Sequence, residues 1–168
     1  MNTQKLAVIY IGSNSIKLAI IEAAASDSFT VILQERDRVR LGETLKTRFI
    51  SPEDIQKSAD AISKFRSISE SRNVDKILAV ATASVREADN SLEFVYEIEA
   101  KTGVRVEVLS SIEEARLIGI AAEQNLGNRH GSLLNIDIGG GSTELSLMTE
   151  GYPEDLFSMK LGAVSLTE

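Results

Sequence analysis

The hydrophobic pattern opens with two short β-branched runs, at residues 6–11 and 16–23, separated by the four small residues Gly12–Ser15. Apolar runs of this length bounded by glycine and serine predict two strands joined by a tight turn. A third strand is predicted across residues 29–41, where apolar side chains alternate in part with polar ones. The chain therefore begins with three successive strands.

Helical periodicity begins after residue 51. Ser51 is a candidate N-cap, Pro52 suits the first helical position, and acidic residues follow near the positive end of the helix dipole. Apolar residues then recur at helical spacing and predict one buried face, made of Ile55, Ala59, Ile62, Phe65 and Ile68.

Alternating strands and helices follow. Residues 76–83 are nearly all apolar, which is typical of a buried strand. Helices are predicted over residues 90–102 and 111–126, ended by Gly103 and Gly127. Further strands are predicted at 105–109, 133–138, 143–148 and 156–161.

The order βββαβαβα followed by βββ indicates an α/β protein with a mixed five-stranded sheet that has an antiparallel meander on one side. This is the element order of a ribonuclease H-like domain. We expect residues 1–125 to form such a domain and residues 126–168 to open a second one that lacks its helices. A three-stranded sheet without its helices has apolar surface to bury and an unpaired edge. This segment should therefore pack against a second copy in a homodimer or be poorly ordered.

An internal repeat supports two related domains. Residues 9–18 and 136–145 align at an offset of 127 residues, with identities at 9/136, 11/138, 12/139, 15/142 and 18/145. Each copy reads as strand, small-residue loop, strand, and the offset suits a duplicated domain rather than a solenoid.

The repeated loops suit anion binding. Glycine and serine let the backbone approach a ligand closely, and successive N–H groups in a tight turn form an anion-binding nest. Two facing loops could hold a phosphate chain from both sides, whereas either loop alone would read as a hairpin turn. The loops match neither the Walker pattern nor G-x-G-x-x-G.

Composition narrows the chemistry. The absence of cysteine excludes disulfides, thiol nucleophiles and cysteine-ligated metals, and the single histidine, His130, lies in a polar run that predicts a turn. Carboxylates must therefore perform any acid–base or metal chemistry. The net charge of −7 argues against nucleic acid as a partner but not against a small phosphorylated substrate. No apolar run is long enough to span a membrane or to form a signal peptide, so we expect a cytoplasmic protein with no membrane partner.

Several segments together resemble one family. They are GSNSIKL (12–18), RVRLGE (38–43), ATASVREADN (81–90), SSIEEARL (110–117), NIDIGGGSTEL (135–145) and LGAVSLTE (161–168). In this order they resemble the Ppx/GppA phosphatases, exopolyphosphatases and guanosine pentaphosphate phosphatases of the actin-like and sugar-kinase-like superfamily. The resemblance implies an actin-like ATPase fold, with a ribonuclease H-like first domain.

The resemblance also implies site residues. Glu114 matches the family's proposed general base, and Asp137 and Glu144 match carboxylates near a divalent metal, Mg²⁺ or a similar cation. The phosphate-binding residues it implies are Gly12, Ser13, Asn14, Ser15, Arg86, Gly139, Gly140, Gly141 and Ser142. From the residues alone, Glu114 reads as a capping acid and Arg86 as an exposed arginine at a helix start. Asp137 lies in an apolar strand, where an unpaired buried carboxylate is costly.

Two positions depart from the family pattern. Tyr10 stands where the family usually has an aspartate that would face Asp137 and help to hold the metal, which puts metal affinity and activity in doubt. Ser111 stands where a glycine is common, which could stiffen the turn before Glu113.

The implied function is metal-dependent hydrolysis of terminal phosphate from inorganic polyphosphate or from guanosine penta- or tetraphosphate. We expect Glu114, Arg86 and both loops to converge on one cleft, and the 168 residues alone to be inactive. The alternatives are a catalytically weakened module that binds and senses such ligands, motivated by Tyr10, and a kinase-like phosphotransferase of the same superfamily. The EEAR and SVREA segments fit the phosphatases better than the kinases.

Overall fold

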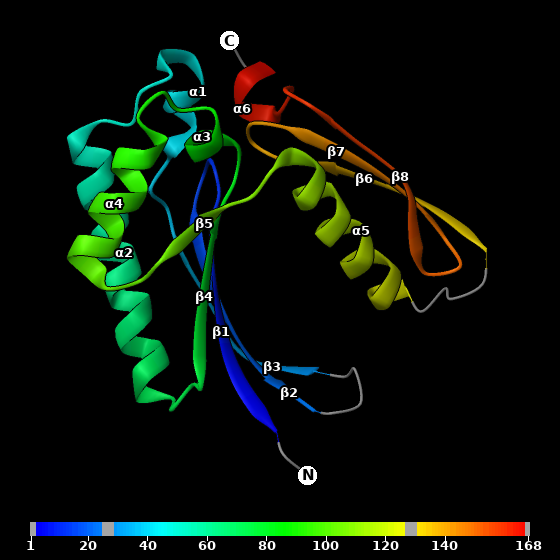
Figure 1. Cartoon of the computed structure of the whole chain (residues 1–168), viewed down its shortest axis with the longest axis horizontal. Helices are drawn as coiled ribbons and strands as arrows, with labels where there is room; N and C mark the ends of the chain where they lie inside the picture. Colours follow the sequence, from blue (N-terminus) through cyan, green and yellow to red (C-terminus); the bar gives the residue numbers. More distant parts are fainter. Residues whose placement is uncertain (1–2, 25–28, 127–130, 167–168) are drawn as a thin grey trace. The chain divides into compact units, whose positions relative to one another are not determined.

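The computed structural model describes residues 3–24, 29–126 and 131–166. The chain divides into two compact units, residues 1–108 (unit 1) and 109–168 (unit 2), which are described separately (Figure 1). The predicted helix at residues 111–126 falls in unit 2, where it packs on the second sheet. The predicted turn at His130 lies outside the described residues.

Unit 1 contains the predicted mixed five-stranded sheet, in the order β3-β2-β1-β4-β5. Its strands are β1 Gln4–Ile11, β2 Ile16–Ala23, β3 Phe29–Asp37, β4 Lys76–Ala81 and β5 Val106–Val108. The first three form an antiparallel meander, and β4 pairs in parallel with β1 and with β5. The expected topology of this sheet is confirmed.

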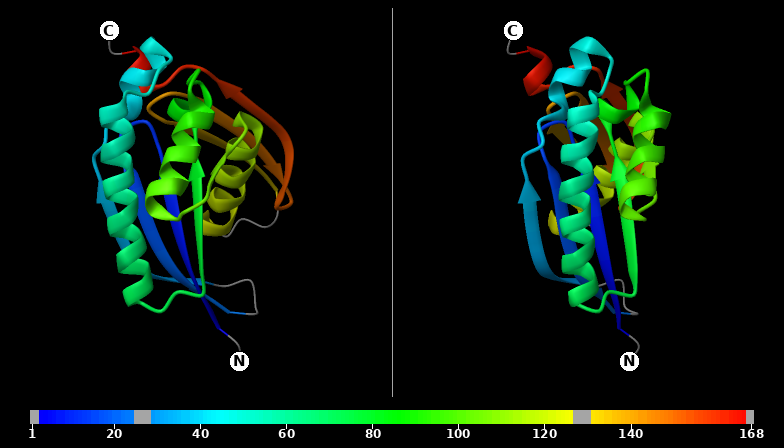
Figure 2. Two further views of the ribbon diagram at one scale, coloured as in Figure 1. Left: turned by 60° about the vertical axis from the view of Figure 1, so that its left-hand side comes forward. Right: turned by 90° about the vertical axis from the view of Figure 1, so that its left-hand side faces the viewer.

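Two long helices, α2 Pro52–Ser71 and α4 Ser91–Thr102, lie on one face of this sheet (Figure 2). Ser51 caps α2 as predicted, since its hydroxyl accepts a hydrogen bond from the Asp54 N–H at 3.1 Å. Alternate residues of β1 and β2 are buried in a shared core with the apolar faces of both helices. The largest buried side chains of this core include Ile9, Ile11, Ile16, Leu18, Ile20, Ile62, Phe65, Phe94 and Ile98.

Short elements alter two predicted strand ends. Strand β3 ends at Asp37 rather than at residue 41, because Arg40 adopts a left-handed conformation (φ 60°) and begins the 3₁₀ helix η1 Leu41–Glu43 and the helix α1 Thr44–Thr47. Strand β4 ends at Ala81, where Thr82 turns the chain into α3 Ala83–Arg86. Strand β4 is also less buried than predicted, since Leu78 on its other face is partly exposed.

Unit 2 is an antiparallel sheet in the order β6-β7-β8 with one long helix on it. Its elements are α5 Ser111–Leu126, β6 Ser132–Ile138, β7 Thr143–Thr149, β8 Tyr152–Met159 and α6 Ala163–Leu166. Strand β8 begins earlier than predicted, directly after a turn at Glu150 and Gly151, which both have positive φ.

Helix α5, which we expected to belong to the first domain, covers one face of the second sheet. The Ser146 hydroxyl on β7 donates a 2.7 Å hydrogen bond to the Ala115 carbonyl of α5, and Met148 beside it is fully buried. Gly119 makes the close approach possible, because a Cβ there would lie 2.8 Å from both Met148 Sδ and Ser146 Cβ. On the other face, Ile136 and Ile138 are 56% and 67% exposed.

Candidate functional site

The first small-residue loop, Gly12–Ser15 (loop 1), closes the hairpin between β1 and β2. Ile11 and Ile16 are the last strand pair, and the Gly12 N–H donates to the Ser15 carbonyl at 3.1 Å. Ser13 and Ser15 are buried, whereas Asn14 at the tip is exposed. The sequence therefore forms a narrow turn whose backbone a ligand can approach from the Asn14 side.

The second loop, Gly139–Ser142 (loop 2), has the same construction. Ile138 and Thr143 form the last pair of β6 and β7, and the Gly139 N–H donates to the Ser142 carbonyl at 2.9 Å. The repeat seen in the sequence is thus also a repeat of register and of hydrogen bonding.

Each loop is clasped by the segment that follows the third strand of its sheet, a feature that the sequence did not reveal. In unit 1 the Arg40 N–H donates to the Asn14 carbonyl at 3.1 Å. In unit 2 the Ala163 and Val164 N–H groups donate to the carbonyls of Gly139 and Gly140, at 2.8 and 2.9 Å. These contacts explain what the RVRLGE and LGAVSLTE segments do: they hold the carbonyls of the loops. The signals in the sequence were their place after the third strand of each repeat and, in the second segment, the glycine at position 162.

Gly162 is part of the second clasp. A Cβ at this position would lie 2.4 Å from the Gly140 carbonyl oxygen and 2.6 Å from the Gly141 nitrogen, both of which are backbone atoms. The Thr143 hydroxyl adds a 2.6 Å hydrogen bond to the Leu161 carbonyl. The close approach of two backbones therefore requires glycine here.

Arg86 lies at the same end of the first sheet as loop 1. Strands β1 and β4 run in parallel with Ile11 opposite Ala81, so loop 1 and helix α3 both follow the carboxyl ends of their strands. The Thr82 N–H donates to the Ile11 carbonyl at 3.2 Å and the Arg86 N–H to the Thr82 carbonyl at 2.9 Å. Unit 1 thus brings together two of the predicted phosphate-binding features.

Glu114 lies in the first turn of α5 and is 5% exposed. The next residue, Ala115, accepts the hydrogen bond from Ser146 on β7, the strand that leads out of loop 2. The helix dipole favours an ionised carboxylate in this turn. Ser111 has no positive φ, so the helix starts there without needing glycine.

The neighbouring Glu113 is a different kind of residue. Its carboxylate accepts hydrogen bonds of 2.8 and 2.7 Å from the Arg116 guanidinium, and these bonds lower the pKa of Glu113. Its N–H donates to the Ser110 hydroxyl at 3.1 Å, which makes Ser110 the cap of α5. Glu113 therefore forms an ion pair on the surface of α5, whereas the neighbouring Glu114 is buried.

Asp137 and Glu144 are directly opposite each other on β6 and β7. The expectation of a buried Asp137 is wrong: β6 is an edge strand and Asp137 is exposed, whereas Glu144 on the central strand is 1% exposed. Glu144 Oε1 accepts a 2.9 Å hydrogen bond from the Ser158 hydroxyl. Within the described part of the chain, no three acidic or histidine side chains are close enough to hold a metal ion together.

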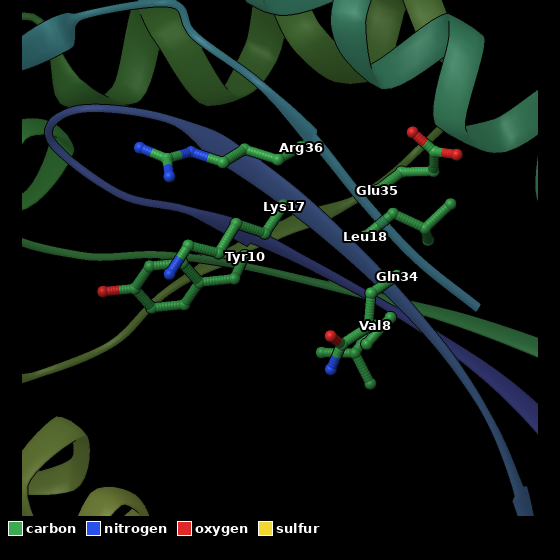
Figure 3. A pocket seen from close by; sticks show the side chains of 8 residues that line it. Val8, Tyr10, Lys17, Leu18, Gln34, Glu35 and Arg36 are labelled. Carbon is green, nitrogen blue, oxygen red and sulfur yellow. The ribbon is translucent and has the colours of Figure 1, made fainter. Parts of the chain in front are cut away.

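Tyr10 occupies in unit 1 the place of Asp137 in unit 2. Its ring lies against loop 1, since a Cβ on Gly12 would be 2.7 Å from Tyr10 Cε1. Its hydroxyl is 3.3 Å from Thr82 Oγ1, and the Lys17 ammonium lies over the ring, 5.8 Å from its centroid (Figure 3). The aromatic ring therefore fills space next to the loop where the repeat has a carboxylate.

The predicted site residues thus fall into two groups. Loop 1 and Arg86 belong to unit 1, and loop 2, Glu114, Asp137 and Glu144 belong to unit 2. Their convergence on one cleft stays a prediction.

Across the residues that the structure describes, no helix is both long and apolar enough to cross a membrane.

Comparisons with known proteins address the family. The chain is 34% identical over 164 residues to exopolyphosphatase 1 of Mycobacterium leprae and 33% identical to that of Mycobacterium tuberculosis, and each match covers 97% of this chain and 48% of the relative. The chain therefore spans about half the length of the curated relatives it matches.

Solved structures of Ppx/GppA and exopolyphosphatase proteins are similar to this chain in fold. The Ppx/GppA family member from Aquifex aeolicus has a TM-score of 0.86 at 28% identity, over 99% of this chain and 54% of that one. An exopolyphosphatase from Cytophaga hutchinsonii has a TM-score of 0.87 at 28% identity, over 95% and 51%. The ethanolamine utilization protein EutJ from Carboxydothermus hydrogenoformans, at a TM-score of 0.53 and 17% identity, shares the fold alone. The expected actin-like ATPase fold is confirmed. The sequence model of the Ppx/GppA phosphatase family matches residues 20–168, and the chain belongs to this family.

Proposed function

We propose that the complete protein hydrolyses the terminal phosphoanhydride bond of inorganic polyphosphate. The observation that carries the proposal is the buried carboxylate of Glu114, held in the first turn of α5 next to the residue that bonds to β7 beyond loop 2. The similarity to mycobacterial exopolyphosphatases supports the substrate class.

In this reaction a water oxygen attacks the terminal phosphorus while the bond from that phosphorus to the bridging oxygen breaks. Glu114 accepts a proton from the water, and the products are orthophosphate and a chain shorter by one phosphate. Phosphoryl transfer asks the protein mainly for positioning and charge stabilisation. The N–H groups of the two loops and the Arg86 guanidinium would supply these to the phosphate oxygens.

The second sheet offers a fitting place for a divalent cation. Asp137 and Glu144 are directly opposed carboxylates, and like charges in that position repel each other unless a cation lies between them. Mg²⁺ is commonly bound through one or two carboxylates together with substrate phosphates, so two acids suffice. When bound, the cation would neutralise charge on the phosphate oxygens.

The test is orthophosphate release from long-chain polyphosphate by the complete protein. Glu114→Gln should lower kcat by roughly 10²- to 10⁴-fold, the range for loss of a general base. Glu113→Gln is the matched control, because it removes the adjacent carboxylate from the same helical turn, and it should retain near-wild-type kcat. Equal losses in the two variants would exclude Glu114 as the base.

A second candidate is a module that binds phosphate chains and hydrolyses them poorly. Tyr10 favours it, because the aromatic ring removes one of the carboxylates expected around the metal. Tight polyphosphate binding by the complete protein without orthophosphate release would support this candidate. Guanosine pentaphosphate is the other substrate to compare in the same assay.

A further inference from the structure

A row of three side chains crosses the first sheet beside loop 1, on the face opposite α2 and α4. Tyr10 on β1 is directly opposite Lys17 on β2, and Lys17 is directly opposite Arg36 on β3. Figure 3 shows these side chains extending in the same direction, whereas the Glu35 carboxylate points away from them.

The row borders a hollow of about 490 Å³ on this face of unit 1. Val8 and Ala19 contribute apolar surface beside the row, and Gln34 contributes an amide. The complete lining is Val8, Tyr10, Lys17, Leu18, Ala19, Gln34, Glu35 and Arg36. The hollow is formed by one unit alone and opens beside loop 1.

Lys17 and Arg36 are two cations directly opposite each other on β2 and β3. Like charges directly opposite on neighbouring strands repel each other, with their Cβ atoms only about 4.5–5.5 Å apart. Some cations of this unit have acidic partners, as Arg48 has Asp89 and Arg66 has Glu70. Neither Lys17 nor Arg36 forms an ion pair with any residue that the structure describes. Two opposed cations in a chain of net charge −7 point to an anion from outside the protein.

Comparison of the two repeats shows that only unit 1 has this pair of opposed cations. The positions equivalent to Tyr10 and Lys17 are Asp137 and Glu144, and Glu144 is opposite Ser158 on the third strand of its sheet. Unit 2 thus has acids at the positions of Tyr10 and Lys17 and a serine at the position of Arg36. Tyr10 matters for this difference, because an aspartate at position 10 would be directly opposite Lys17 and would neutralise it.

We propose that Tyr10, Lys17 and Arg36 form a subsite for internal phosphates of a linear polyphosphate chain, one that binds without a metal ion. The inference rests on the proposed function. The Tyr10 ring positions the Lys17 ammonium, and the two cations bind phosphates that extend away from loop 1.

The test uses the 168-residue chain and long-chain polyphosphate, with a chelator present, in calorimetric titrations over a range of salt concentrations. Lys17→Ala/Arg36→Ala should weaken binding by at least about tenfold and lower the salt dependence by roughly two counterions. The control, Arg72→Ala/Lys76→Ala, removes the same charge at the other end of the sheet and should bind like the wild type. Far-ultraviolet circular dichroism checks that both variants are folded.

The outcomes separate the two proposals. An unchanged affinity in Lys17→Ala/Arg36→Ala, or an equal loss in the control, would overturn the subsite and leave the hydrolytic function standing. Absence of polyphosphate binding to the 168-residue chain would overturn the subsite, whereas absence of orthophosphate release by the complete protein would overturn the hydrolytic function. Guanosine tetraphosphate is the comparison ligand: if it bound as tightly as the long chain and lost the same affinity in the variant, the assignment to inorganic polyphosphate would fail.

Discussion

Gly12→Ala tests how closely Tyr10 packs against loop 1. Gly12 has no positive φ, so alanine is conformationally allowed, and it would stabilise the fold by about 0.4–1 kcal/mol through the unfolded state. The new methyl group would, however, lie 2.7 Å from Tyr10 Cε1, and the Tyr10 hydroxyl is 3.3 Å from Thr82 Oγ1. Overpacking of this kind costs about 1–3 kcal/mol, so we expect a net destabilisation of about 1–2 kcal/mol.

A double-mutant cycle isolates the contact. In the Tyr10→Asp background the clash is gone, and Gly12→Ala should stabilise by about 0.4–1 kcal/mol, a coupling of about 1–3 kcal/mol. Gly139→Ala is the control from loop 2: its methyl group would lie 3.1 Å from the Ser142 carbonyl, far in sequence from Tyr10. Its effect should add to that of Tyr10→Asp within about 0.5 kcal/mol. The free energy of unfolding of each variant is measured in urea, with hydrogen exchange in peptides from β1 and β2 as the probe of unfolding. A coupling below about 0.5 kcal/mol for Gly12 would refute the packing argument.

Three further predictions concern the loops and α5. Tyr10→Asp should raise Mg²⁺ affinity in calorimetric titration of the complete protein, and equal affinities would mean that Tyr10 does not replace a metal ligand. Gly162→Ala should loosen loop 2, with faster amide exchange at Gly139 and Gly140, because its methyl group would collide with backbone atoms. The hydrogen bonds from Arg116 lower the pKa of Glu113, so they stabilise the fold at every pH above the ordinary pKa of 4.5. This stabilisation is lost as the pH falls through the lowered pKa. In acid unfolding the difference between wild type and Glu113→Gln should therefore disappear at low pH, and a constant difference would contradict it.

The elements that the sequence predicted well are those with enough residues to show a period. Helix α2 has a cap, a proline and five regularly spaced apolar residues; the structure buries four of these apolar residues and packs the fifth, Ile68, partly buried against the core. The short helical elements η1, α1, α3 and α6 have three or four residues each, too few for any period to show. The left-handed Arg40 that ends β3 has no sequence signature, because it depends on the hydrogen bond to loop 1.

The sequence proposes candidate site residues but does not give their environments. The repeat proposes both loops, and the family motif proposes Glu114. The exposure of Asp137 could not be predicted, because it depends on β6 being an edge strand and on α5 packing over β7 and β8. The clasps of the loops consist of backbone hydrogen bonds, which leave little trace in side-chain identity except at Gly162.

The two sheets also differ in which repeated residues are covered. Ile9 and Ile11 are buried under the helices of unit 1, whereas the equivalent Ile136 and Ile138 are 56% and 67% exposed. The same apolar side chains at equivalent positions require the same cover. Since the curated relatives are about twice as long as this chain, we expect a helical layer equivalent to α2 and α4 to cover them in the complete protein. In the 168-residue chain the amides of β6 should then exchange faster than those of β4. Equally slow exchange in a strictly monomeric sample would show that the second sheet needs no such layer.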